Sequence, residues 1–128
     1  MSYQDARNKL RLAIETALTS NGMAVKRRNR EISLTPQTKW ARLTYLNAEA
    51  KSAELGQLTI RDTGFVVIDL FFPLGQGTEE ADRISILIRD TFSEWQYNYL
   101  ELGVGSINDV PTTLDYFHVA VNIPFRHK

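Results

Sequence analysis

Cysteine is absent from this chain of 128 residues. Its absence excludes a disulfide framework, a zinc site built on thiolates and a cysteine nucleophile. The chain also lacks an excess of either charge. Its 15 basic and 15 acidic side chains cancel, so no overall field favours nucleic acid or an anionic membrane as a partner. No apolar run approaches the ~20 residues of a membrane span, and the N-terminus lacks the basic and then apolar order of a signal peptide. We therefore expect a protein that is made and kept in a cytosol-like compartment until it is assembled into a larger structure.

What is present is the composition of an ordinary globular protein. Hydrophobic residues make up 43% of the chain and charged residues 23%, values typical of a soluble domain. A chain of this length is long enough to bury one hydrophobic core and short enough to form one unit. Residues 1–128 are therefore predicted to form a single domain.

Two helices are predicted from the three-to-four spacing of apolar residues. The first spans about residues 3–20, with Ser2 as its cap, and ends at Asn21-Gly22, where Gly22 suits a left-handed conformation. The second follows Thr78 as its cap and carries acidic side chains in its first turn, where the helix dipole favours them. Its buried stripe is predicted to comprise Ala81, Ile84, Leu87, Ile88, Thr91, Phe92 and Trp95.

Alternating and apolar segments predict the strands. They fall at about residues 40–47, 55–62, 65–72 and 114–123. In the last of these, one side is predicted to comprise Phe117, Val119, Val121 and Ile123, and the other, more polar side Tyr116, His118, Ala120 and Asn122. Thr63-Gly64 is predicted to form a turn, and residues 96–111 an irregular segment with room for a short strand. Because short turns join antiparallel neighbours, we predict an α+β fold: an antiparallel sheet of about four to five strands with two main helices packed on one face.

The segment from Phe65 to Phe72 is the most informative in the chain, because it is apolar on both faces of a strand. Successive strand side chains point to opposite faces, so Val66, Ile68, Leu70 and Phe72 share one side, and Phe65, Val67 and Phe71 share the other. The two helices can cover one side. A neighbouring subunit is the favoured cover for the other side, and residues 96–113 folded back over the sheet are the alternative. The strand therefore points toward assembly rather than catalysis.

No cofactor or metal is expected. The turn Gly75-Gln76-Gly77-Thr78 precedes a helix, as phosphate loops do, but it lacks the lysine of such loops, and Glu79 and Glu80 would repel a phosphate. A strand-to-helix turn explains the glycines more simply. His118 and His127 lack the convergent neighbours that a metal site requires.

Asp69 is the one charged residue of the apolar strand. Buried carboxylates are paired or shifted in pKa, so we interpret Asp69 as a partner of Arg61, Arg83 or Arg42, or as a residue of a subunit interface. A hydrolase built on Asp69 and His118 is an alternative that requires the two side chains to converge in one cleft. The sequence nominates no further group for such a reaction, and no catalytic residue is predicted.

The strongest charge feature is the basic cluster Lys26-Arg27-Arg28-Asn29-Arg30. Such clusters contact nucleic acid or acidic proteins, or form a solvated loop. Here no aromatic side chains alternate with the basic ones to stack on bases. A solvated loop is therefore favoured over an acidic protein partner, and direct DNA contact is the least favoured of the three.

Several segments of the chain are informative because of the order and the spacing in which they occur. They are Trp40-Ala41-Arg42-Leu43, then Thr63-Gly64 and the apolar strand to Phe71-Phe72-Pro73, then Gly75-Gln76-Gly77-Thr78, and last Val119-Ala120-Val121-Asn122-Ile123-Pro124-Phe125. In order and spacing they resemble the tail terminator, or tail completion, proteins of long-tailed phages of the lambda-like group and their prophage relatives. The resemblance covers about residues 40–125, with the N-terminal helix in its expected place.

The resemblance implies a non-enzymatic virion protein. Such proteins form a hexameric ring on the end of the finished tail tube, stop the addition of tube subunits and present a surface for joining the head. The implied partners are further copies of the chain, the major tail tube protein and a head–tail joining or neck protein. The implied location is the host cytoplasm during assembly and then the virion tail.

A ring made by head-to-tail contacts needs two different complementary patches on each subunit. The candidate interface residues are Lys26, Arg27, Arg28, Arg30, Trp40, Arg42, Val66, Ile68, Asp69, Leu70 and Phe72. Two other functions remain open. One is a head–tail connector or another minor tail protein, and the other is a small nucleic-acid-binding module.

Overall fold

A computed structural model of the chain describes residues 3–26, 39–47, 51–52, 60–73, 79–97, 100–110 and 116–127. Its two helices are α1 (Tyr3–Ser20) and α2 (Glu79–Phe92). The strands are β1 (Ala24–Lys26), β2 (Trp40–Asn47), β3 (Lys51–Ser52), β4 (Ile60–Pro73), β5 (Gln96–Tyr97), β6 (Leu100–Leu102), β7 (Ser106–Val110) and β8 (Tyr116–His127). No helix within these ranges has the length and apolar character needed to cross a membrane.

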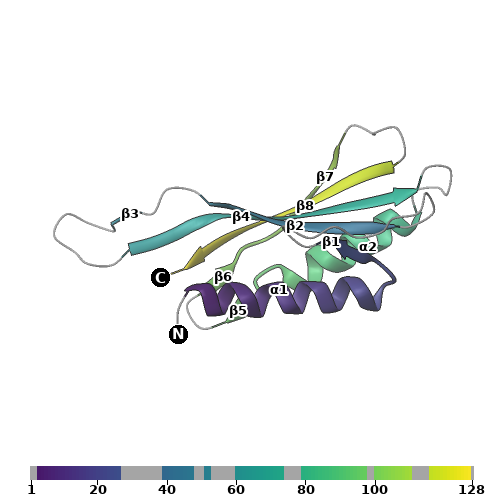
Figure 1. The fold of residues 1–128 in the computed structure, drawn as a ribbon. Helices are drawn as coiled ribbons and strands as arrows, with labels where there is room; N and C mark the ends of the chain where they lie inside the picture. Colours follow the sequence, from purple (N-terminus) through teal and green to yellow (C-terminus); the bar gives the residue numbers. More distant parts are fainter. Residues whose placement is uncertain are drawn as a thin grey trace.

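One twisted sheet lies above a layer formed by both helices (Figure 1). The strand order is β1-β2-β4-β8-β6-β5, with β3 added to β4 and β7 added to β8. The predicted α+β class and the packing of two helices on one face agree with this arrangement. The predicted sheet of four to five antiparallel strands is wrong in detail, because short strands extend it and the β1–β2 pair is parallel. A parallel pair requires a connection of about a dozen residues, and residues 27–39 provide it.

The longest strand, β4, corrects a second expectation. A turn was predicted at Thr63-Gly64, yet β4 runs without interruption for 14 residues. Gly64 pairs with Asn47 of β2 on one side and with Phe125 of β8 on the other. These two ladders hold the glycine in an extended conformation, so the turn signal of its sequence is overridden.

Residues 96–113 were considered as a cover for the sheet, but the described part of this segment, residues 96–97 and 100–110, instead extends the sheet. β6 pairs with the end of β8, from Phe125 to His127, while β7 pairs with an earlier part of the same strand, from His118 to Asn122. Both lie beside β8, in the plane of the sheet, so the described part of this segment does not cover the face opposite the helices.

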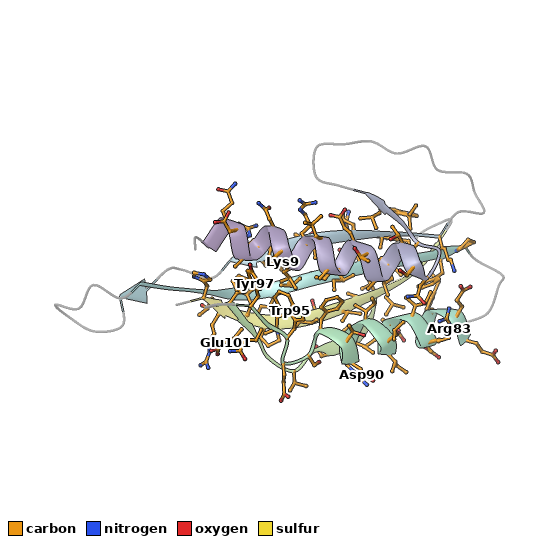
Figure 2. All side chains as sticks on the ribbon, turned by 90° about the horizontal axis from the view of Figure 1, so that it is seen from below. Lys9, Arg83, Asp90, Trp95, Tyr97 and Glu101 are labelled. Carbon is orange, nitrogen blue, oxygen red and sulfur yellow. The ribbon has the colours of Figure 1, made fainter. Side chains whose placement is uncertain are left out.

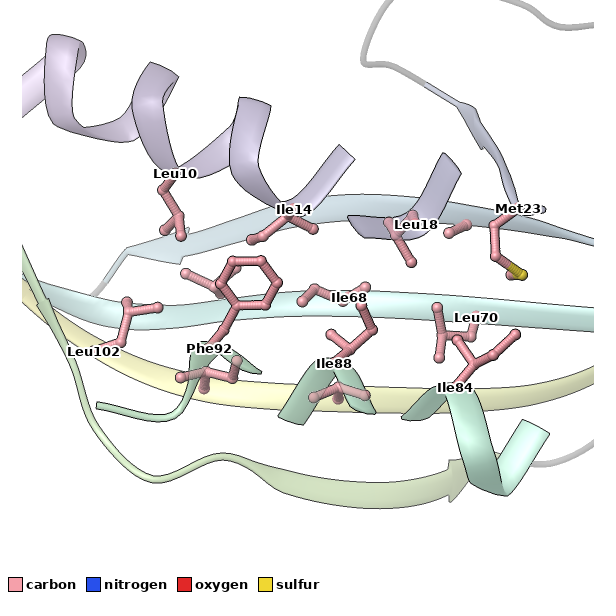
Figure 3. Packing of buried hydrophobic residues seen from close by; sticks show 14 of the residues in the cluster. Leu10, Ile14, Leu18, Met23, Ile68, Leu70, Ile84, Ile88, Phe92 and Leu102 are labelled. Atoms are coloured by element: carbon pink, nitrogen blue, oxygen red, sulfur yellow. The ribbon is translucent and has the colours of Figure 1, made fainter. Parts of the chain in front are cut away.

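The hydrophobic core fills the space between the helices and the sheet (Figure 3). Leu10, Ile14 and Leu18 of α1 point down onto the sheet, and Ile84 and Ile88 of α2 lie beside them. The sheet contributes mainly alternate residues of β4 and β8, among them Val66, Ile68, Leu70, Phe72, Val119, Val121, Ile123 and Phe125. In α2, Leu87 and Thr91 were predicted to be buried but are exposed, because the helix turns only a narrow stripe toward the sheet.

Gly22 ends α1 as predicted. Its φ of 79° is left-handed, and two hydrogen bonds close the helix: the Gly22 amide donates to the Thr19 carbonyl at 3.1 Å, and the Met23 amide donates to the Leu18 carbonyl at 3.0 Å. This is the Schellman arrangement, in which apolar residues on either side of the glycine meet. Met23 and Leu18 are both buried in the core, so the cap also directs the chain from α1 into β1.

Candidate interaction surface on the open face of the sheet

The sheet face opposite the two helices carries the features that suggest a function, and we call it the open face. Residues directly paired across strands share a face, so the registers of β2, β4 and β8 define its members. They include Trp40, Arg42, Thr44 and Leu46 of β2, Phe65, Val67, Asp69 and Phe71 of β4, and His118, Ala120, Asn122 and Pro124 of β8. No helix among the described residues packs on this side of the sheet (Figure 1).

Three rings form a stack across the open face. Phe71 is paired with Trp40 on one neighbouring strand and with His118 on the other. The Trp40 and Phe71 rings are 4.1 Å apart between centroids, with planes 9° apart, and Phe71 lies 4.2 Å from His118. Stacked rings at such distances stabilise each other and cover the backbone beneath. Phe71 and His118 are thereby buried although neither described helix, α1 or α2, lies over them.

Asp69 lies beside this stack and holds the charged groups together. Its Oδ1 is 2.8 Å from Nε2 of His118, and its Oδ2 accepts hydrogen bonds from Nε and Nη2 of Arg42 at 3.4 and 3.3 Å. Asp69 is only 8% exposed, so these partners replace the water that the carboxylate loses. The sequence left three arginines as partners, and the structure pairs Asp69 with Arg42, which stands directly opposite on β2.

The Asp69–His118 contact bears on the hydrolase alternative. The two side chains converge, as that alternative required, but their hydrogen bonds join them to each other and to Arg42. No hydroxyl group within the described residues is bonded to the pair to act as a nucleophile, and such a group is what a nucleophile–base site needs. The geometry is that of a structural ion cluster closed by stacked rings.

Metal binding receives no support from the part of the chain that the structure describes. A metal site needs several His, Cys, Asp or Glu side chains that converge. No group of three or more such side chains occurs within the described ranges.

An apolar and accessible pair of side chains lies further along the open face. Leu46 and Phe65 stand directly opposite each other on β2 and β4, and they are 55% and 49% exposed. Half-buried Val67 follows on β4. Two large apolar side chains paired at the surface are suited to contact with another protein.

Four of the predicted interface residues lie elsewhere. Val66, Ile68, Leu70 and Phe72 belong to the core beneath the helices, so within one subunit they are not available to a partner. The alternation along the strand was read correctly, but only the packed structure identifies which side the helices cover. The accessible side is that of Phe65, Val67, Asp69 and Phe71.

The other predicted residues lie on or beside the open face where they are described. Trp40, Arg42 and Asp69 belong to it, and β1 places Lys26 in register with Arg42. Arg27, Arg28 and Arg30 lie outside the described residues. Sequence reasoning did not single out Leu46, and it raised the convergence of His118 with Asp69 only as the condition of a hydrolase, not as an ion pair. The alternation in the last strand had placed His118 on its more polar side, but nothing local gave the strand pairing.

The comparisons with known proteins agree with this architecture. A family model described as phage tail terminator protein matches residues 6–125. The chain belongs to the phage tail terminator family. The matched residues include nearly all of both helices and the sheet from β1 into β8, so the family assignment rests on almost the whole chain, and it confirms the resemblance seen in the sequence.

A solved protein structure is similar in fold to this tail terminator family member. The TM-score is 0.68 and the identity 16%, and the match covers 95% of each chain. At this identity the likeness establishes a shared fold. No curated protein matches the sequence.

Proposed function

We propose that this protein caps the phage tail tube as a hexameric ring, ends tail polymerisation and prepares the tail for joining to the head. The observation that carries the proposal is the family match over residues 6–125. The family is one of structural tail proteins, and the proposed role has no catalytic step. Its partners are further copies of the chain, the major tail tube protein and a head–tail joining or neck protein.

The open face supports a role in assembly. Large apolar side chains that adjoin each other at the surface are more often interaction sites than ones that are scattered singly, and Leu46 and Phe65 are such a pair. On the same face, the ring stack and the Asp69 cluster bind the three central strands to one another. An interface that is reproduced in every subunit of a ring needs such a preorganised surface.

Location follows from the same proposal. The chain is synthesised and folded in the host cytoplasm, and it is incorporated into the virion tail when the tube reaches its final length. The proposal requires no cofactor and no direct contact with DNA.

Deletion of this gene from the phage that carries it tests the proposal. Electron microscopy of the lysate is expected to show tails of excessive and variable length without heads, because tube growth has lost its stop. Tails of normal length that fail to join heads would instead make the protein a connector, and unaltered infectious particles would overturn both roles. Expression of the intact gene in trans should restore normal tails.

A further inference from the structure

Asn21 and Gly22 form the only Asn-Gly pair in the sequence, and they join α1 to β1. This dipeptide is the one most prone to deamidation, because glycine has no Cβ to hinder attack by its own backbone nitrogen on the preceding side chain. The reaction needs only water and mild base. Its rate depends on whether the backbone and the side-chain amide are free to take up the reactive geometry.

The reaction forms one covalent bond before it breaks another. The backbone nitrogen of Gly22 attacks Cγ of Asn21, while a solvent base takes the proton of that nitrogen and returns it to Nδ2. Nδ2 then leaves as ammonia, and a succinimide ring remains. Water opens the ring at either carbonyl, which gives aspartate or isoaspartate. In isoaspartate the backbone runs through the former side chain and is one carbon longer.

The attacking nitrogen is held by the cap of α1. The Gly22 amide donates to the Thr19 carbonyl at 3.1 Å, and the next amide, of Met23, donates to the Leu18 carbonyl at 3.0 Å. The proton that the Gly22 nitrogen must lose is the one that it donates in this cap. Attack on Asn21 therefore requires that the first of these hydrogen bonds breaks.

The side chain that is attacked is held by both of its polar atoms. Nδ2 of Asn21 donates to the Ala17 carbonyl at 2.8 Å, and Oδ1 accepts from Nη1 of Arg83 at 3.3 Å. Arg83 belongs to α2 and lies beside the end of α1 (Figure 2). The leaving nitrogen and the carbonyl oxygen are thus restrained from two different helices, and rotation of the carboxamide breaks both contacts.

We propose that Asn21 is a site of spontaneous deamidation that the fold keeps closed, and that it reacts only when the end of α1 opens from its cap and from α2. Helix ends open locally at a lower free energy than the core does, so the rate of modification reports this opening. Isoaspartate here would lengthen the backbone inside the cap, between the buried residues Leu18 and Met23, and would keep the helix end from closing as before. None of these steps depends on the proposed role in the tail.

Ageing of the purified full-length protein in mildly alkaline buffer, followed by mass spectrometry of its peptides, measures the loss of Asn21. The folded protein is compared with the same chain in guanidinium chloride at one pH and one temperature. The rate in the folded protein is expected to be lower by about tenfold or more, because the opened state must form first. Equal rates in the two conditions would overturn the proposal.

Two variants test the restraint from α2. Arg83→Ala removes the partner of Oδ1 and should raise the rate in the folded protein by about two- to tenfold, the effect of losing one hydrogen bond, while the rate in the unfolded chain stays the same. The matched control is Arg89→Ala, which removes a guanidinium that bonds to Asp90 on the same helix and should change neither rate. Circular dichroism checks that both variants are folded. An unchanged rate in folded Arg83→Ala, or an equal rise in both variants, would contradict the restraint of Asn21 by α2.

Discussion

Asp69 of β4 and His118 of β8 are joined by a hydrogen bond of 2.8 Å on the open face of the sheet, 49 residues apart in the sequence. Phe71 stacks on the same histidine, and Arg42 reaches the same carboxylate from the other neighbouring strand. The cluster therefore ties the three central strands together through side chains as well as through their ladders.

Replacing Asp69 with Asn should destabilise the fold. The neutral amide weakens the bonds to Arg42 and His118 in a site from which water is largely excluded, and the expected loss is about 1–3 kcal/mol of unfolding free energy. Urea denaturation measures it. The control is Glu101→Gln, because the Glu101–Arg126 pair is more exposed and such pairs are worth about 0–1 kcal/mol. Equal losses of unfolding free energy in the two variants would show that the Asp69 cluster contributes no more to stability than the exposed Glu101–Arg126 pair.

Truncation of side chains on the two faces of β4 should change the free energy of unfolding by very different amounts. Ile68→Ala removes methyl groups from the core and should cost about 2–5 kcal/mol, because Ile68 is fully buried beneath the helices. Phe65→Ala on the open face should change the stability of the monomer by about 0.5 kcal/mol or less. Denaturation at a concentration where the protein is monomeric compares the two. A large loss for Phe65→Ala there would mean that the open face is covered within one subunit.

Gly22 ends α1 in a left-handed backbone conformation that glycine adopts more readily than other residues. Gly22→Ala should cost about 1–2 kcal/mol, which is the penalty of that conformation for an L-residue. An added Cβ would also lie 3.3 Å from Cε of Lys39. Gly22→Asn is the matched control and should cost less, because asparagine tolerates the left-handed region. Thermal unfolding of the three proteins should give the order Gly, Asn, Ala, and an alanine variant as stable as the parent would contradict the cap.

The helices and the two faces of the central strands could be predicted from sequence because their signals are local. The apolar spacing gave α1 at residues 3–20, as the structure has it. The alternation in the last strand correctly separated Phe117 and Val119 from His118 and Ala120. These features depend on residues a few positions apart, which a sequence displays directly.

The misplaced features depend on partners that are distant in sequence. Gly64 is extended because two other strands pair with it, and no neighbour in the chain reveals that. Val66 and Phe65 are equally suited to either side of a sheet, so only the position of the helices decides which one is exposed. For the same reason the link from Asp69 to His118 and the exposure of Leu87 could not be derived beforehand.

The basic residues Arg27, Arg28 and Arg30 lie outside the described residues, and their role stays a prediction from sequence. We expect them to face the lumen of the ring or the acidic end of the tail tube. Changing all three to Ala should then weaken capping and lengthen tails, while circular dichroism shows the fold unchanged. The control is Lys9→Ala with Arg83→Ala, which removes positive charge from exposed positions of the two helices.

Normal tail length in the triple variant would contradict this role. The same protein also tests the nucleic-acid alternative, because a DNA-binding cluster should give filter binding that falls steeply as salt rises. We expect no such binding at physiological salt, since the chain is neutral overall and has no aromatic side chains within the cluster. Salt-sensitive retention of DNA that disappears in the triple variant would move the cluster from protein contact to DNA contact and leave the open face as the remaining site for assembly.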